Sequence, residues 1–172
     1  MRRSLKIGTA VLTLLSASGN TWASAANSSG CATPDDRFAL QAAAVQQKLM
    51  VAAFTCQVTQ LYNRFVLTYQ KDLQVSDFAL QNFFRRLYGQ TGIADYHSFK
   101  TRLANTSSIE SMRDTHGYCA NAQAIFNAAF VNAKKPLTVF LAGQTTTMDN
   151  AFPRCTYIAS STKMAPERPA AR

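Results

Sequence analysis

Apolar residues recur at helical spacing from residue 35 to about residue 70. A first stripe consists of Phe38, Ala42, Val45, Leu49, Ala52 and Cys56, and a second of Phe54, Val58, Leu61, Phe65 and Tyr69. Spacings of three and four residues are those of one face of an α-helix. Neither glycine nor proline occurs between Asp35 and Tyr88, and Thr33 is a candidate N-cap. The pattern therefore predicts one long helix over about 35–70, and a bend near Phe54 would fit the change of phase.

Capping residues and glycines in the rest of the chain predict several shorter helices. Ser76 is a candidate N-cap, glycines follow or precede several periodic stretches, and Asn105–Ser107 resembles a cap between two of them. The expected helices lie near 77–88, 94–115 (broken into 94–103 and 108–115), 118–131 and 136–142. No long alternating pattern typical of a strand is present. We therefore predict an all-α fold, a single disulfide-stapled helical bundle over residues 26–160.

Aromatic residues are expected to form one half of the core. Phe54, Leu61 and Phe65 should face the helix that carries Phe83, Phe84 and Leu87. Truncation of a buried phenylalanine such as Phe65 typically costs about 3–5 kcal/mol. The neighbouring Arg85 and Arg86 should point to solvent, so that replacing Arg86 should change stability by no more than about 0.5 kcal/mol.

Four cysteines, Cys31, Cys56, Cys119 and Cys155, predict two disulfides in an exported chain. An unbroken helix from residue 35 to 56 spans about 31 Å. The four residues from Cys31 to the start of this helix span at most about 14 Å. Because bonded cysteines need Cα atoms about 5.5 Å apart, a Cys31–Cys56 disulfide is disfavoured. Of the two remaining schemes we prefer Cys56–Cys119, because both lie on apolar faces of central helices. Cys31–Cys155 would then join the two ends of the domain.

The first 25 residues have the pattern of a cleaved signal peptide. Basic residues precede a short apolar run at 7–15, and Ala23-Ser24-Ala25 forms a small-x-small cleavage site. The run is too short to cross a bilayer of about 30 Å, and we expect no transmembrane segment in the mature chain. Residues 161–172, rich in alanine, proline and charge, should be disordered. A twin-arginine signal and lipidation of Cys31 are weaker alternatives, because the first motif is incomplete and a polar stretch separates Cys31 from the apolar run.

The chain is basic without a concentrated basic surface. The signal holds three of the eighteen basic residues and none of the nine acidic ones, so the mature chain carries a net charge of +6. Arg85-Arg86 and Lys134-Lys135 are pairs, not runs. We therefore expect no specific nucleic-acid partner, because such binding requires clustered charge. An envelope protein or an anionic polymer is the expected partner.

Candidate catalytic residues are few. Asp95, Tyr96 and His97 are the closest approach to an acid–base cluster, yet adjacent residues on a helix point to different sides. No histidine lies in a metal-binding motif, and glycine patterns for phosphate or dinucleotide binding are absent. The isolated methionines offer no axial haem ligand set. We predict no cofactor and no metal.

Several stretches are similar to small exported helical proteins of proteobacteria. They are Leu40–Ala44, Met50–Ala53, Tyr62–Phe65, Phe83–Tyr88 and Tyr96–Lys100, within residues 36–130. The resemblance implies a bacterial envelope setting and carries over no activity or site.

The sequence thus favours a periplasmic or secreted helical protein with a non-enzymatic binding or envelope-accessory role. A cell-envelope hydrolase or lyase using His97 with Asp95 is the leading alternative. A periplasmic chaperone for acid stress ranks third, because the chain has few acidic residues whose protonation could switch its state.

Overall fold

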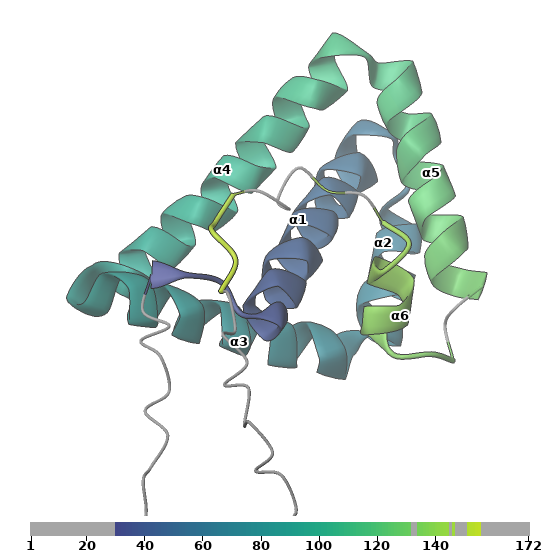
Figure 1. Ribbon diagram of the computed structural model, residues 1–172. Coiled ribbons are helices and arrows are strands. Elements are labelled where there is room, and N and C mark those ends of the chain that lie inside the picture. Colours follow the sequence, from purple (N-terminus) through teal and green to yellow (C-terminus); the bar gives the residue numbers. More distant parts are fainter. Residues whose placement is uncertain (1–29, 132–133, 145, 147–150, 156–172) are drawn as a thin grey trace, which may run out of the picture.

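The fold is all-α, as predicted. The computed structural model describes residues 30–131, 134–144, 146 and 151–155, so the predicted signal peptide and C-terminal tail lie outside the described residues. The helices are α1 (Pro34–Thr55), α2 (Thr59–Thr68), α3 (Gln70–Tyr88), α4 (Gly92–Arg113), α5 (Thr115–Val131) and α6 (Leu137–Leu141), with a 3-10 turn, η2, at Gly89–Thr91. Figure 1 shows α3 along one side, α4 and α5 meeting at a corner opposite it, and α1 between them.

The prediction of one helix over 35–70 is wrong, because the chain breaks between α1 and α2 at 56–58. Gln57 has a positive φ of 57°, which is uncommon for a residue other than glycine. Cys56 is held there by its disulfide to Cys119, and the Thr59 hydroxyl donates to the Ala53 carbonyl at 3.1 Å. The break lies where the two apolar stripes change phase, and these tertiary and local bonds hold it without glycine or proline.

Helices α3 and α4 also differ from the predictions. Helix α3 begins at Gln70, so Ser76 lies inside the helix, where its buried hydroxyl donates to the Leu73 carbonyl at 3.0 Å and caps nothing. Helix α4 runs without a break through Asn105–Ser107. Leu103, Ser107 and Ser111 are buried along one face of it, and this burial outweighs the weak local preference of cap-like residues.

The helices near 118–131 and 136–142 are present as α5 and α6. Helix α5 starts one turn earlier than expected, since the Asp114 carboxylate accepts from the Gly117 N–H at 2.8 Å. Gly92 permits the close turn from α3 into α4, because a Cβ atom there would lie 2.6 Å from the Arg85 Cα.

The predicted aromatic half-core is split into two clusters. Phe65 packs with Tyr69 and Phe140 in the cluster between α1, α2, α5 and α6. Phe83 and Phe84 belong to a separate cluster between α1, α3 and α4. Phe54 is 74% exposed and belongs to neither. The prediction that Phe54 and Phe65 face Phe83 and Phe84 is therefore wrong, because the break after α1 turns α2 away from that part of α3.

Both predicted disulfides are present. Cys56–Cys119 joins the end of α1 to α5, with Cα atoms 5.6 Å apart. Cys31–Cys155 joins the two ends of the described chain, with Cα atoms 5.0 Å apart. Beside the second bridge the Ala32 N–H donates to the Pro153 carbonyl at 2.8 Å. The geometric argument against Cys31–Cys56 holds, because α1 reaches Thr55 without a break.

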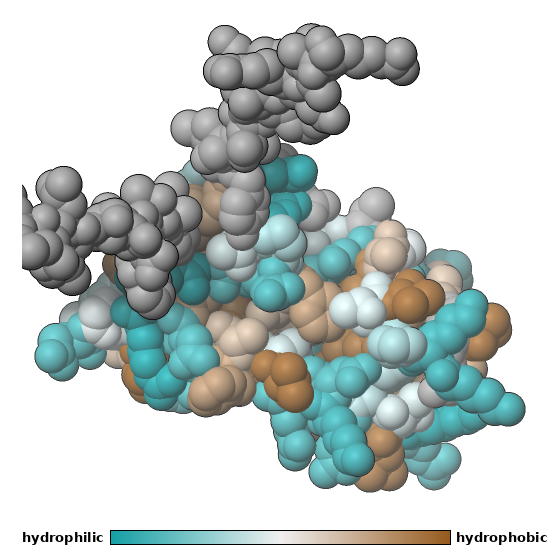
Figure 2. All heavy atoms as spheres, turned by 60° about the horizontal axis from the view of Figure 1, so that its bottom comes forward, coloured by the Kyte–Doolittle hydropathy of each residue, from teal (hydrophilic) through white to brown (hydrophobic). Residues whose placement is uncertain are grey.

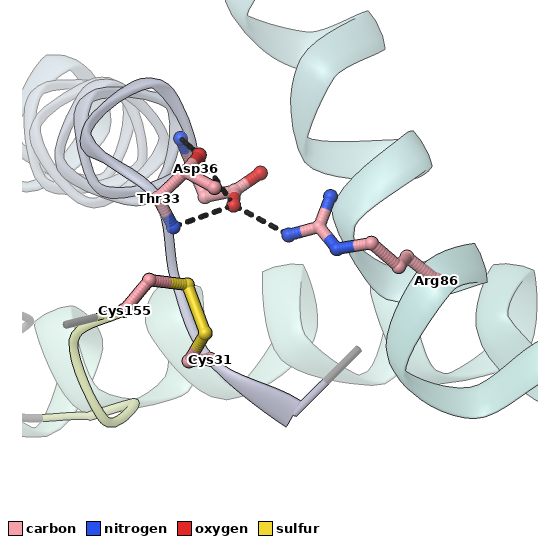
Figure 3. Close-up of polar contacts among 5 residues, drawn as sticks. All are labelled: Cys31, Thr33, Asp36, Arg86 and Cys155. Carbon is pink, nitrogen blue, oxygen red and sulfur yellow. Dashed lines mark hydrogen bonds and ion pairs between the residues drawn. A yellow bond between two sulfur atoms is a disulfide. The ribbon is translucent and has the colours of Figure 1, made fainter. Parts of the chain in front are cut away.

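The start of α1 is fixed by a buried carboxylate. Thr33 and Asp36 form a capping box: the Asp36 N–H donates to the Thr33 hydroxyl at 3.2 Å, and the Thr33 N–H donates to Asp36 Oδ2 at 2.8 Å. The Arg86 guanidinium of α3 donates to the same oxygen (Figure 3). Arg86 is thus not the free surface residue predicted from the sequence, since it supplies the counter-charge to a buried Asp36.

Phe65→Ala should lower the free energy of unfolding by about 3–5 kcal/mol, through lost transfer energy and a cavity. The Phe65 side chain is 1% exposed. Chemical denaturation followed by circular dichroism measures the loss. Phe54→Ala is the matched control, because an exposed phenylalanine leaves no cavity. Equal losses for the two variants would contradict the assignment of the core.

Arg86→Ala should destabilise the fold by about 1–3 kcal/mol, because it leaves a buried carboxylate without its charged donor. Arg85→Ala is the control: Arg85 is exposed and its guanidinium donates to exposed Asn82, so we expect a change within about 0.5 kcal/mol. Thermal and urea unfolding of the two variants compares them directly. If the two variants were equally stable, Arg86 would not contribute to stability through Asp36, and the prediction of an exposed Arg86 without a structural role would be right.

Candidate functional site: a polar groove centred on Asp77

A groove of about 480 Å³ lies where α3 faces α1, α2 and α4. This volume is within the range of small-ligand sites. Its walls are mostly polar, with a few apolar side chains. They consist of Gln46 from α1, Val66 from α2, Gln70, Leu73, Gln74, Asp77, Phe78 and Gln81 from α3, and Tyr96 and Lys100 from α4.

Asp77 is the centre of the groove's hydrogen-bond network. The Tyr96 hydroxyl donates to Asp77 Oδ1 at 2.7 Å, and the Lys100 ammonium donates to the same oxygen at 2.9 Å. The Gln81 amide donates to Asp77 Oδ2 at 3.0 Å. Tyr96 and Lys100 are one turn apart on α4, so both reach the carboxylate together. The network holds α3 against α4.

These contacts shift two pKa values in opposite directions. Burial raises the pKa of Asp77, but the hydrogen bonds from Tyr96 and Lys100 and the charge of Lys100 outweigh it, so the pKa lies below its usual value. Burial, followed by the hydrogen bond to Asp77 and its negative charge, raises the pKa of Tyr96 well above its usual value. At neutral pH Asp77 is therefore a carboxylate acceptor and Tyr96 a protonated donor.

The rim of the groove offers amides and one large aromatic side chain. Gln70, Gln74 and Gln81 are on α3 beside it, and Phe78, 62% exposed, lies among them. An amide side chain can both donate and accept hydrogen bonds. The arrangement can therefore hold a polar segment by hydrogen bonds and an apolar side chain against Phe78.

The structure does not join the three residues that the sequence singled out as catalytic candidates into one hydrogen-bonded cluster, as far as the described contacts go. Tyr96 lies in the groove, bonded to Asp77. The Asp95 carboxylate accepts from the Thr91 hydroxyl at 2.7 Å. His97 is exposed, and its ring lies 4.9 Å from the ring of Tyr96, centroid to centroid. No hydrogen bond joins Asp95 to His97 among the described contacts, and a catalytic role for the three residues stays the alternative hypothesis.

Sequence reasoning missed Asp77 and Lys100. Asp77 precedes Tyr96 by nineteen residues and Lys100 by twenty-three. The sequence shows that Tyr96 and Lys100 are four residues apart and so lie on one side of a helix. The carboxylate to which both donate, that of Asp77, comes from another helix. Only the packing of α3 on α4 brings the three together.

In the described part of the chain, no three histidine, cysteine or carboxylate side chains are grouped so that they could hold a metal ion. None of the described helices is both long and apolar enough to cross a membrane. Comparison with known protein families, curated proteins and solved structures finds no match to this chain.

Asp77→Asn should lower the free energy of unfolding at pH 7 by about 1–3 kcal/mol, because a charged acceptor of three hydrogen bonds becomes neutral. The folded pKa lies below the unfolded value of about 3.9, so the stabilisation is present above that value and is lost as pH falls through the folded pKa. The difference between wild type and variant should therefore shrink below about pH 4. Urea unfolding at several pH values measures it.

Asp95→Asn is the control for that series. Asp95 is partly exposed and accepts a single hydrogen bond among the described residues, from the Thr91 hydroxyl, so a much smaller change is expected at every pH. A difference for Asp77→Asn that stayed constant down to pH 2 would show that the charge of Asp77 does not stabilise the fold.

Proposed function

We propose that this is an exported, non-enzymatic binding protein of the periplasm or the cell exterior. Its partner is an envelope protein that presents an acidic segment with an apolar anchor, and the segment docks on the groove and on the exposed face of α3. The two disulfides support the export part of the proposal, because such bridges persist in oxidising compartments.

The observation that carries the binding role is the exposure of Phe78 at the rim of a polar groove. Val75, one turn away on α3, is 68% exposed. Figure 2 turns the α3 side of the molecule forward and shows apolar side chains set among hydrophilic ones. Partner-binding surfaces have this composition, with aromatic anchors inside a polar rim.

Charge on the same helix favours an acidic partner. The exposed stripe of α3 contains Lys71 and Arg85 on either side of Val75 and Phe78. The nearby Asp77 carboxylate is already bonded to Lys100, Tyr96 and Gln81. The charge that this stripe offers to a partner is therefore positive.

The state of the groove's titratable groups also supports binding over catalysis. A tyrosine general base needs a lowered pKa, whereas the pKa of Tyr96 is raised. Asp77 carries three hydrogen bonds and has a lowered pKa, so it is a weak base. Such groups position neighbours and accept hydrogen bonds.

Crosslinking in the native envelope, followed by purification of the captured protein, tests the proposal. The dissociation constant of the purified pair is then measured for wild type and for Phe78→Ala. Loss of an aromatic anchor should weaken binding at least about tenfold. Higher salt should weaken it further, because exposed charges are screened.

Phe54→Ala is the matched control, since Phe54 is an even more exposed phenylalanine that does not line the groove. It should bind as wild type does. Equal losses in both variants, or no loss in either, would contradict the assigned surface. Turnover of a defined envelope substrate by the purified protein, abolished by His97→Ala, would instead establish the enzymatic alternative.

A further inference from the structure

A second cavity, separate from the Asp77 groove, lies between α1, α4, α5 and the residues Gly143, Gln144 and Thr146. Its volume is about 200 Å³, which is roughly the volume that seven water molecules occupy in liquid water. A molecule of about ten non-hydrogen atoms or fewer fits such a space. We call it the α1–α4–α5 cavity.

The cavity carries one positive and one negative group. Lys48 Nζ of α1 and Glu110 Oε2 of α4 are 3.6 Å apart, and their side chains are 30% and 42% exposed. This separation exceeds that of a good hydrogen bond. The two charges therefore attract each other while each keeps bonding capacity for a third group.

The rest of the wall combines apolar surface with an unsatisfied hydroxyl. Val45 and Leu103 are buried there, and Ile125 is half-buried. The Thr146 hydroxyl is buried and has no hydrogen-bond partner among the described atoms. A buried polar group without a partner is costly, so a ligand that bonds to this hydroxyl gains that energy back.

The walls are held in place before any ligand arrives. The Gln41 amide of α1 donates to the Leu141 carbonyl at 2.9 Å and to the Gln144 carbonyl at 2.7 Å. The Tyr118 hydroxyl of α5 donates to the Lys48 carbonyl at 2.9 Å. Because both contacts anchor cavity-lining segments to α1, little ordering is needed on binding.

We propose that the α1–α4–α5 cavity binds a free α-amino acid with a small apolar side chain. The ligand carboxylate pairs with Lys48, its ammonium pairs with Glu110, and its side chain contacts Val45 and Leu103. A ligand with only a negative charge would be repelled by Glu110, and one with only a positive charge would be repelled by Lys48. A zwitterion, which carries both charges, therefore suits the pair better than either. This inference is independent of the proposed partner surface on α3.

Calorimetric titration of the disulfide-bonded protein with alanine, valine and leucine tests the proposal. We expect saturable binding of at least one of them. For leucine, two analogues each remove one charge: 4-methylpentanoate lacks the ammonium and 3-methylbutylamine lacks the carboxylate. Each should bind at least about tenfold more weakly than the best amino acid. No binding of the three amino acids, or equal binding of an analogue, would overturn the proposal.

Variants locate the site. Lys48→Gln and Glu110→Gln should each weaken binding at least about tenfold, whereas Lys71→Gln, an exposed position on α3 outside the cavity, should not change it. Ala44→Leu fills the cavity without removing a charge, and should abolish binding while near-ultraviolet circular dichroism shows an intact fold. Unchanged affinity in folded Ala44→Leu would place the site elsewhere and refute the assignment. Phe78→Ala should bind the amino acid normally, which separates this result from that of the partner surface.

Discussion

Burial of α1 is the constraint on which the rest of the structure depends. Helices α2 to α6 all contact it. Half of its buried positions are alanines, and these have almost no exposed surface: Ala39, Ala42, Ala43, Ala52 and Ala53. Small side chains let neighbouring backbones approach closely and from several directions. A helix surrounded in this way cannot show one clean apolar stripe, and α1 divides its residues between two aromatic clusters.

Two aspartates connect neighbouring helices, with different consequences. Asp36 is buried, belongs to the capping box of α1 and binds Arg86 from α3. Asp77 lies in an open groove on α3 and binds Tyr96 and Lys100 from α4. The first carboxylate is shielded from any partner and therefore serves the fold. The second serves the fold and also sets the polarity of a surface that a partner can reach.

The two hollows differ in the chemistry that they offer. The Asp77 groove is larger and open, has amides and an exposed aromatic at its rim, and is bordered by positive charge on α3. The α1–α4–α5 cavity is smaller, contains a balanced pair of charges and reaches buried apolar surface. The first therefore suits a segment of a larger molecule and the second a small zwitterion. Lys100 belongs to one and Lys48 to the other, so each can be altered alone.

The sequence by itself determined the helical class, the positions of α5 and α6, and the pairing of the cysteines. These followed from short-range periodicity and from the length of one unbroken helix, which are properties of contiguous residues. Tertiary structure was needed for the break at 56–58, where the Cys56–Cys119 disulfide holds the end of α1, and for the continuity of α4, along which Ser107 is buried. These contacts outweigh the local preferences that the sequence shows. For the candidate site, the sequence named only Tyr96. Asp77 and Lys100, like Lys48 and Glu110 in the cavity, come together from different helices, and no spacing along the chain encodes such a meeting.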